Sequence, residues 1–585
     1  MQTIVSELSN LVSDAFVRCG YDRDLGNVII SNRPDLCHYQ CDGAFRGAKQ
    51  YRKAPLAIAS EVAGHLKGQA IFTEVSAVAP GFINLTLSDE KIVDYVNKMI
   101  SQDSVGIPKT ENVETIIIDY GGPNIAKPLH IGHLRAAIIG ESLKRLMKFL
   151  GYHVIGDIHL GDWGLQIGLV IAELSERFPG YSCFSGDYHE GDALPSFTAD
   201  DLNEIYPFAS NKSKSDAQFS EKAHNFTFEL QQGNAGFIAL WKLILQTSVE
   251  DLKKNYDRLN VEFDLWLGES DADKYVGDVI ALLNEKGLLE DSNGAKIVNI
   301  ANESDRAPTP PAIIVKSDGA INYETTDIAT ILQRERDYSP DKIWYVVDKR
   351  QELHFIQVFR TSKMAGIAAE NMELLHLGFG TMNGSDGKPY KTREGGIMRL
   401  SEMIETVTAG ALEKMRESMH ISLDMQQDVA RKIGVAAIKF GDLINHRTKD
   451  YIFDLDKFLS FEGRTGTYIL YTIARINSIL KKAGYTEDGS ACIGGIYSDS
   501  ERGLLLKAVE TGNVFWTAAG EKAPNYICEN AYQIAAGFSQ FYHENHILHE
   551  SDEVRKTSWL NLCRFVRMLL TLHLDVLGID TVEFM

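Results

Sequence analysis

The chain has 585 residues, more than one hydrophobic core of about 250–300 residues can organise, so we expect several domains. Its net charge of −21, from 59 basic and 80 acidic residues, argues against sequence-independent nucleic-acid binding through a basic coat. A local basic track could still bind one RNA. The 44% hydrophobic content favours a folded chain, and because no run of about eighteen apolar residues occurs, we expect a cytoplasmic protein without a membrane-spanning helix.

The cysteines predict free thiols in a reducing compartment, because they are seven in number and irregularly spaced. The cluster of Cys37, His38 and Cys41 could form half of a zinc site, but no second Cys/His pair lies at finger spacing. We therefore expect no metal site built from protein side chains.

The order of predicted elements indicates a multidomain α/β plus all-α protein. Residues 1–108 mix short helical and strand-like segments and predict a small α/β domain that ends in turn residues at 106–108. Residues 115–119 form an apolar run closed by a carboxylate, typical of a buried parallel strand, and residues 130–150 follow with helical spacing. A strand, a glycine-rich loop and a helix in this order predict a doubly wound, Rossmann-type domain over residues 109–400.

This domain is predicted to contain an insertion at about residues 172–246, where the chain becomes polar. The α/β alternation then resumes with candidate buried strands at 261–264, 312–315 and 342–347. Residues 401–585 are almost entirely helical in period and predict a helix bundle.

The strongest chemical signal lies between Gly121 and His133. His130 and His133 are three residues apart at the first turn of a predicted helix, beside free backbone N–H groups and the positive end of the helix dipole. Gly132 removes a side chain where an adenine ring could approach the backbone. This pattern favours a polyphosphate site, although a capped helix start with one imidazole in a core would also explain the two histidines.

The residues before the histidines, Pro123-Asn124-Ile125-Ala126-Lys127-Pro128, extend this motif. The whole segment resembles the HIGH signature of class I aminoacyl-tRNA synthetases, whose catalytic domain is HUP-like, and in particular their arginine-specific branch. The resemblance implies that Pro123, His130, Gly132 and His133 bind ATP. It also implies that the two histidines stabilise the phosphates as pyrophosphate leaves.

The second signature of the family, KMSKS, corresponds to residues 387–396 but departs from it clearly. Lys388, Lys391 and Arg393 supply cations for phosphate, and Thr392 could stand where a lysine is usual. The resemblance then implies that Lys127 takes over the missing charge. A solvated basic turn is the alternative interpretation of this segment.

Arginine needs a pocket with carboxylates for its planar charged fork. Asp119 ends the first strand, and Tyr323 and Asp327 are four residues apart on one helix face. These three residues resemble the family's guanidinium pocket, and the resemblance adds Asn124 and Gln351. By itself Asp327 would more often be a surface charge. Two further family-like segments, 161–166 and 258–270, are predicted to be mainly scaffold.

Tyr468, Tyr471 and Arg475 share one predicted helix face and could stack on unpaired bases, although bundle core is the more usual role of such spacing. The resemblance implies that this helical region reads the anticodon, with Met585 near the anticodon loop, and that residues 1–108 contact the tRNA elbow.

Together these features predict an enzyme that activates L-arginine with ATP, carried with Mg²⁺, and transfers it to tRNA(Arg). The resemblance implies that activation needs tRNA, and we expect a monomer. Three alternatives are another class I synthetase, a smaller HxGH-type adenylyl transferase, and a synthetase-like RNA-binding protein without catalysis.

Overall fold

The computed structural model describes residues 1–585 with the exception of 306, 385, 389–397, 416–422 and 487–490. The chain divides into two compact units. The first comprises Met1–Glu111, Lys414–Ile444 and Lys457–Met585, and the second comprises Asn112–Glu413 and Asn445–Asp456.

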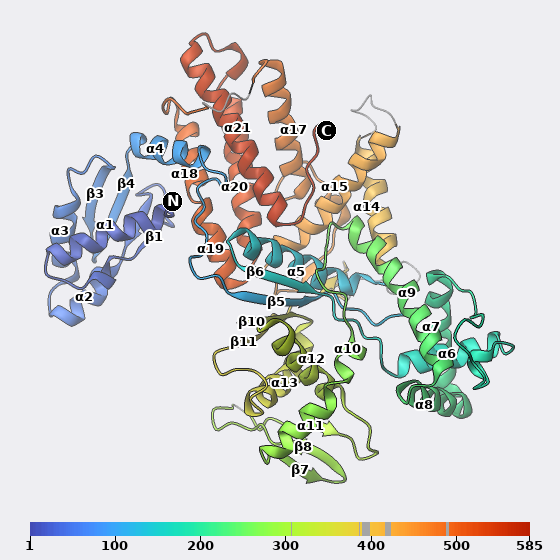
Figure 1. The fold of residues 1–585 in the computed structure, drawn as a ribbon. Coiled ribbons are helices and arrows are strands. Elements are labelled where there is room, and N and C mark those ends of the chain that lie inside the picture. Colours follow the sequence, from blue (N-terminus) through green and yellow to red (C-terminus); the bar gives the residue numbers. More distant parts are fainter. Residues whose placement is uncertain (306, 385, 389–397, 416–422, 487–490) are drawn as a thin grey trace. The chain divides into compact units, whose positions relative to one another are not determined.

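The amino-terminal part of the first unit is a small α/β fold, drawn in blue in Figure 1. Its antiparallel sheet has the order β1-β2-β4-β3 and is covered by helices. The first helix begins where Thr3 caps the backbone N–H of Ser6, and its apolar stripe is buried. The elements are α1 (Ile4–Arg18), η1 (Arg23–Gly26), β1 (Val28–Ile30), β2 (Tyr39–Cys41), α2 (Gly43–Tyr51), α3 (Pro55–Leu66), β3 (Phe72–Val78), β4 (Phe82–Leu87) and α4 (Asp89–Ile100).

The carboxyl-terminal part of the first unit is helical, as the sequence predicts, and is drawn in orange and red in Figure 1. Arg502 joins it to the amino-terminal part through two bonds to the Asp89 carboxylate, at 2.7 and 2.6 Å. Its helices are α15 (Leu423–Leu443), α16 (Leu455–Phe458), α17 (Gly466–Lys482), α18 (Asp499–Val509), α19 (Thr511–Glu521), α20 (Asn525–Glu544), η4 (Ile547–His549) and α21 (Glu553–Val576).

The second unit contains a parallel sheet of order β11-β10-β5-β6. Figure 1 shows α5 on one face of this sheet and α12 and α13 on the other. The core between sheet and helices is aliphatic, with Ile117, Ile328 and Ile343 fully buried. Its elements are β5 (Thr115–Tyr120), α5 (Ile131–Phe149), β6 (His153–Asp157), α12 (Tyr323–Tyr338), β10 (Lys342–Val346), η3 (Lys349–Gln351), α13 (Glu352–Met364) and β11 (Glu373–His376). The doubly wound start predicted from the sequence is therefore confirmed.

Of the candidate buried strands, 261–264 is wrong, and 312–315 is a strand that joins a different sheet. Residues 261–264 form no strand. The segment meets the end of β6 through isolated bonds: the N–H groups of Asp264 and Leu265 donate to the Gly156 carbonyl at 2.8 and 3.0 Å, and the Gly156 N–H donates to the Asp264 carboxylate at 2.8 Å. Residues 312–315 do form a strand, β9 (Ala312–Val315), but it pairs in a separate antiparallel sheet with β7 (Leu289–Ser292) and β8 (Ala295–Val298). An apolar run alone does not specify which sheet a strand joins.

Helices follow β6 in the region where the sequence becomes polar. In the second unit α6 packs against both α7 and α8. The remaining elements of the second unit are α6 (Leu165–Arg177), η2 (Ser182–Phe184), α7 (Ala199–Ser215), α8 (Ala217–Gln231), α9 (Ala235–Arg258), α10 (Glu269–Asp273), α11 (Val276–Glu285), β12 (Met382–Asn383), α14 (Leu400–Met415) and β13 (Tyr451–Ile452).

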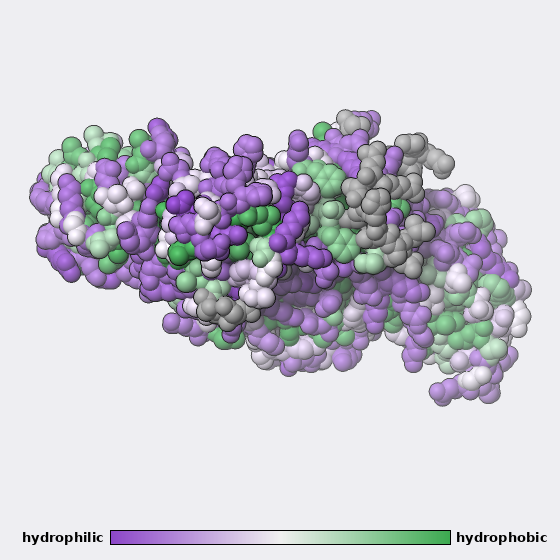
Figure 2. Space-filling model, turned by 90° about the horizontal axis from the view of Figure 1, so that it is seen from above, coloured by the Kyte–Doolittle hydropathy of each residue, from purple (hydrophilic) through white to green (hydrophobic). Residues whose placement is uncertain are grey.

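The visible surface is mostly hydrophilic, with apolar residues in small patches (Figure 2). Among the described helices, none combines the length and the apolar character needed to cross a membrane.

Candidate active site

A pocket of about 660 Å³ opens at the carboxyl end of the parallel sheet. The ends of β5 and β10, the start of α5 and residues from α12 contribute to its wall. Five of the residues predicted from the sequence line it together: Asp119, His130, Gly132, His133 and Asp327. Ligands of doubly wound sheets bind at this edge, so the pocket is the candidate active site.

The start of α5 fixes both histidines. Nδ1 of His130 accepts from the backbone N–H of Gly132 at 3.0 Å, and Nδ1 of His133 accepts from the backbone N–H of His130 at 3.2 Å. Each ring therefore keeps its proton on Nε2, which remains as a donor. A Cβ on Gly132 would lie 2.7 Å from Cε1 of His130, so only glycine allows the ring to fold over the helix start.

Both imidazoles are neutral at physiological pH. Burial lowers the pKa of His133 to about 3, with a further contribution from His130. Burial also lowers the pKa of His130, and the charge of Lys127 acts in the same direction. Neutral Nε2–H groups can donate hydrogen bonds to phosphate oxygens, and neither histidine needs to act as a base.

Asp119, in the pocket wall, is ion-paired with a buried arginine. The buried guanidinium of Arg334, two helical turns beyond Asp327 on α12, donates to Asp119 Oδ2 and Asp157 Oδ2, each at 2.6 Å. Burial raises the pKa of Asp119, and the Arg334 charge opposes that rise. Asp119, Asp157 and His159 have metal-ligand atoms within 4.8 Å of one another, but the guanidinium between the carboxylates makes this cluster a poor cation site.

Asp327 is held by a second buried partner. Its Oδ2 lies 2.5 Å from Nε2 of His354 on α13, whose ring packs 4.9 Å from the Tyr323 ring. Glu269, at the start of α10, adds another carboxyl group near Asp327. Burial raises the pKa of Glu269 to about 7, and the charge of Asp327 pushes it in the same direction. This side of the pocket is therefore rich in carboxyl groups.

None of the remaining described residues that were predicted for the nucleotide or for arginine lines this pocket. Tyr323 is 58% exposed, and Asn124, Gln351 and Lys388 are also exposed. The backbone carbonyl of Pro123 accepts from Gly161 N–H at 3.1 Å. Lys127, Asn124 and residues of α7 and α9 line a separate small cavity. Lys391 and Arg393 lie outside the described residues.

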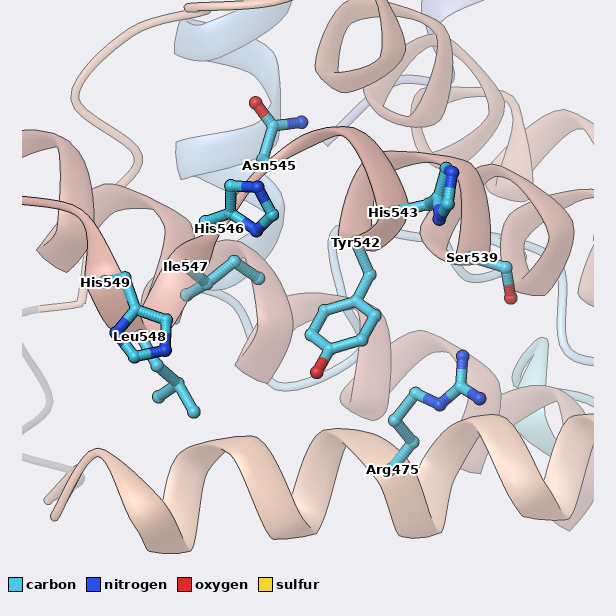
Figure 3. A pocket seen from close by; sticks show the side chains of 9 residues that line it. All are labelled: Arg475, Ser539, Tyr542, His543, Asn545, His546, Ile547, Leu548 and His549. Atoms are coloured by element: carbon cyan, nitrogen blue, oxygen red, sulfur yellow. The ribbon is translucent and has the colours of Figure 1, made fainter.

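The predicted RNA-binding residues lie together on α17 in the first unit. Tyr468 and Tyr471 are half-buried, and Tyr471 accepts from the Arg475 guanidinium at 2.7 Å. Arg475 lines a pocket of about 550 Å³ with Tyr542 of α20 and three histidines, His543, His546 and His549 (Figure 3). The chain end lies along the same helix, since Asn477 donates to the Glu583 carbonyl at 3.1 Å, two residues before Met585.

Comparison with known proteins gives the family. The catalytic-domain family described as "tRNA synthetases class I (R)" matches residues 95–455. The arginine–tRNA ligase of Alkaliphilus oremlandii is 49% identical over 587 residues, covering 100% of both chains. The chain belongs to the arginyl-tRNA synthetase family. The arginyl-tRNA synthetase N-terminal domain matches residues 3–87 and the DALR anticodon-binding domain matches residues 469–585 of this family member.

Other arginyl-tRNA synthetases agree with the assignment and with the fold. The arginine–tRNA ligase of Agathobacter rectalis is 44% identical over 597 residues, covering 100% of both chains. The arginyl-tRNA synthetase structures from Plasmodium falciparum (TM-score 0.82, 24% identity) and Thermus thermophilus (TM-score 0.78, 21% identity) match the fold over 100% of both chains.

Four residues that contact or lie near the pocket carboxylates of this arginyl-tRNA synthetase family member were not predicted from the sequence. Asp157 ends β6 and pairs in register with Asp119 of β5, so its position at a strand end could have been noticed. Arg334 follows Asp327 by seven residues, a spacing that returns to the same helix face. Neither His354 nor Glu269 carries such a local signal. Glu269 lies within a segment interpreted as scaffold.

Proposed function

We propose that this chain is an arginine–tRNA ligase that converts L-arginine and ATP to arginyl-adenylate and pyrophosphate, and then transfers arginine to the 3′ end of tRNA(Arg). In the first step a carboxylate oxygen of arginine attacks the α-phosphorus of ATP and the bond to pyrophosphate breaks. In the second step a hydroxyl of the terminal adenosine attacks the arginyl carbonyl and AMP leaves. The observation that carries the proposal is one pocket with two neutral histidine donors and a carboxyl-rich wall.

In this proposal the triphosphate lies against the start of α5. Pro123 and Gly132 leave room for the nucleotide, and the Nε2–H groups of His130 and His133 donate to phosphate oxygens as pyrophosphate leaves. Lys127, Lys388, Lys391 and Arg393 supply positive charge for the phosphates. ATP brings Mg²⁺ with it, which would neutralise phosphate charge.

The guanidinium of the substrate meets the carboxyl groups of Asp327 and Asp119. His354 orients Asp327, and Arg334 leaves Asp119 with one carboxylate oxygen that accepts nothing from that guanidinium. Tyr323 covers the mouth with its ring, and Asn124 and Gln351 hold the amino-acid end. Arg334 binds Asp119 and Asp157, whereas Asp327 bonds to a histidine and Glu269 lies near it, so the Asp327 side of the pocket favours the substrate guanidinium.

The tRNA contacts follow from the same proposal. Residues 1–108 form the domain that contacts the tRNA elbow, residues 109–400 with the insertion at 172–246 form the catalytic domain, and residues 401–585 bind the stem and read the anticodon. Tyr468, Tyr471, Arg475 and Met585 are the proposed contacts of the anticodon loop. The cytoplasmic location and the monomeric state stay predictions.

Exchange of labelled pyrophosphate into ATP tests the proposal. We expect exchange with arginine only when tRNA is present, including tRNA whose terminal ribose is oxidised and cannot accept, because the incomplete cationic loop needs a second ligand to complete it. Citrulline, which has the same shape without the charge, should support no exchange. Exchange driven by another amino acid would contradict the arginine pocket, and strong exchange without tRNA would contradict the tRNA requirement.

A further inference from the structure

The ammonium group of Lys127 is stacked on an aromatic ring of the insertion. Its Nζ lies 4.5 Å from the ring centroid of Tyr206 on α7. Tyr206 is half-buried and packs against a small apolar cluster that includes Leu169 of α6 and Phe219 of α8. Lys127 lines the cavity between the histidine loop and α7, and it is not part of the nucleotide pocket wall. The lysine expected at the phosphates is therefore engaged elsewhere.

Hydrogen bonds fix the backbone just before Lys127, so any movement toward the phosphates must be made by the Lys127 side chain. Ala126 has a φ of 60°, in the left-handed region that alanine rarely adopts, and its N–H donates to the hydroxyl of Ser248 at 3.1 Å. Ile125 N–H donates to the carbonyl of Gly161 at 3.0 Å. Contacts from two separate elements thus fix the chain immediately before Lys127.

The ammonium is nevertheless within electrostatic reach of the active site. After burial, the charge of Lys127 is the next cause that lowers the pKa of His130, and it also contributes at His133. A triphosphate bound beside these histidines would attract the same ammonium. To approach the phosphates, the Lys127 side chain would have to rotate away from Tyr206.

We propose that Tyr206 is a positioning residue that holds the Lys127 ammonium outside the nucleotide pocket until ATP binds. The proposal rests on the function proposed above, in which Lys127 contacts ATP phosphates. Lys127 must then give up its cation–π contact when ATP binds, so the ring weakens ATP binding. Cation–π contacts correspond to about 2-fold to 30-fold in an equilibrium constant.

A ring series at position 206 tests this balance through the dissociation constant of ATP, measured by calorimetric titration of the full chain without amino acid or tRNA. Tyr206→Leu should tighten ATP binding by about threefold or more, Tyr206→Phe should stay close to the parent, and Tyr206→Trp should weaken binding, since tryptophan binds cations best. Loss of packing alone would not give this order.

The matched control is Phe208→Leu. Phe208 is also on α7, is 52% exposed and has its own cation–π contacts with Arg177 and Lys212, at 5.5 and 5.9 Å, but it does not contact Lys127. It should leave the ATP dissociation constant unchanged. In a Lys127→Ala background, the substitutions at Tyr206 should not change the ATP dissociation constant. The proposal would be overturned if the ATP dissociation constant were the same in all Tyr206 variants of the parent chain, or if Tyr206→Leu bound ATP more weakly than the parent.

A second readout separates this proposal from the function on which it rests. In exchange assays with arginine and tRNA, Tyr206→Leu should lower the KM for ATP about threefold and leave the KM for arginine unchanged. An equal shift in both constants would indicate a general disturbance of the site and contradict the role of Tyr206. If the parent exchanges another amino acid, the arginine assignment fails, while the ATP titrations still decide the role of Tyr206.

Discussion

Replacement of Asp327 by asparagine should weaken arginine binding by about 2 kcal/mol, or about 30-fold in the dissociation constant. The substitution keeps the shape of the side chain and removes its charge. Hydrogen bonds to charged groups contribute about 1.5–3 kcal/mol, and a buried charge left without its partner costs about 2–5 kcal/mol. We use the lower end because the Asp327 side chain is 28% exposed.

The assay is equilibrium titration of arginine, with Asp278→Asn as the matched control. Asp278 pairs with Arg336 of α12 at 2.6 Å, but both partners are about half-exposed, so their pair contributes at most about 1 kcal/mol to stability. Asp278→Asn should not change arginine binding. Tyr323→Phe should weaken arginine binding less than Asp327→Asn does, because it keeps the ring beside His354. Parent-like arginine affinity in the Asp327 variant would refute the pocket assignment.

Three further predictions address the histidine loop and acid stability. His130→Ala and His133→Ala should each slow the chemical step about 10²–10³-fold in single-turnover experiments while arginine affinity is kept; near-parent rates would remove them from the mechanism. Gly132→Ala should lower this rate at least about tenfold, because its Cβ would displace the His130 ring, with little loss of stability at an exposed position; an unchanged rate would refute that contact. Burial lowers the pKa of His573 to about 4 from 6.5, so the unfolded chain takes up a proton that the native one does not as pH falls through this window. The free energy of unfolding should therefore fall by about 2 kcal/mol between pH 7 and 5 through this group, and denaturant titrations of His573→Gln should lack that component.

The histidine loop could be predicted from sequence because its geometry is local. His130, Gly132 and His133 belong to one helical turn, and their mutual contacts need no other part of the chain. Asp119 and Asp327 were found through a strand end and a family motif. The environment of these two carboxylates could not be predicted, since the guanidinium that binds Asp119 comes from Arg334, 215 residues further along the chain. Sequence spacing carries no information on such a pair.

The errors have a similar origin. Residues 261–264 have the composition of a buried strand, yet they meet the end of β6 through isolated bonds to Gly156. The contact that Lys127 makes with Tyr206 could not be predicted either. Its partner in the structure, Tyr206, belongs to a polar insertion without any sharp motif, so only tertiary structure brings the two together.

The most direct test of the central claim is aminoacylation of bulk tRNA with each proteinogenic amino acid in turn. The assay measures acid-precipitable labelled amino acid at fixed ATP and Mg²⁺. The pocket of carboxyl groups around Asp327 predicts that arginine alone is attached to tRNA, and that Asp327→Asn lowers this activity at subsaturating arginine. Attachment of a different amino acid, or binding of tRNA without any aminoacylation, would contradict the account.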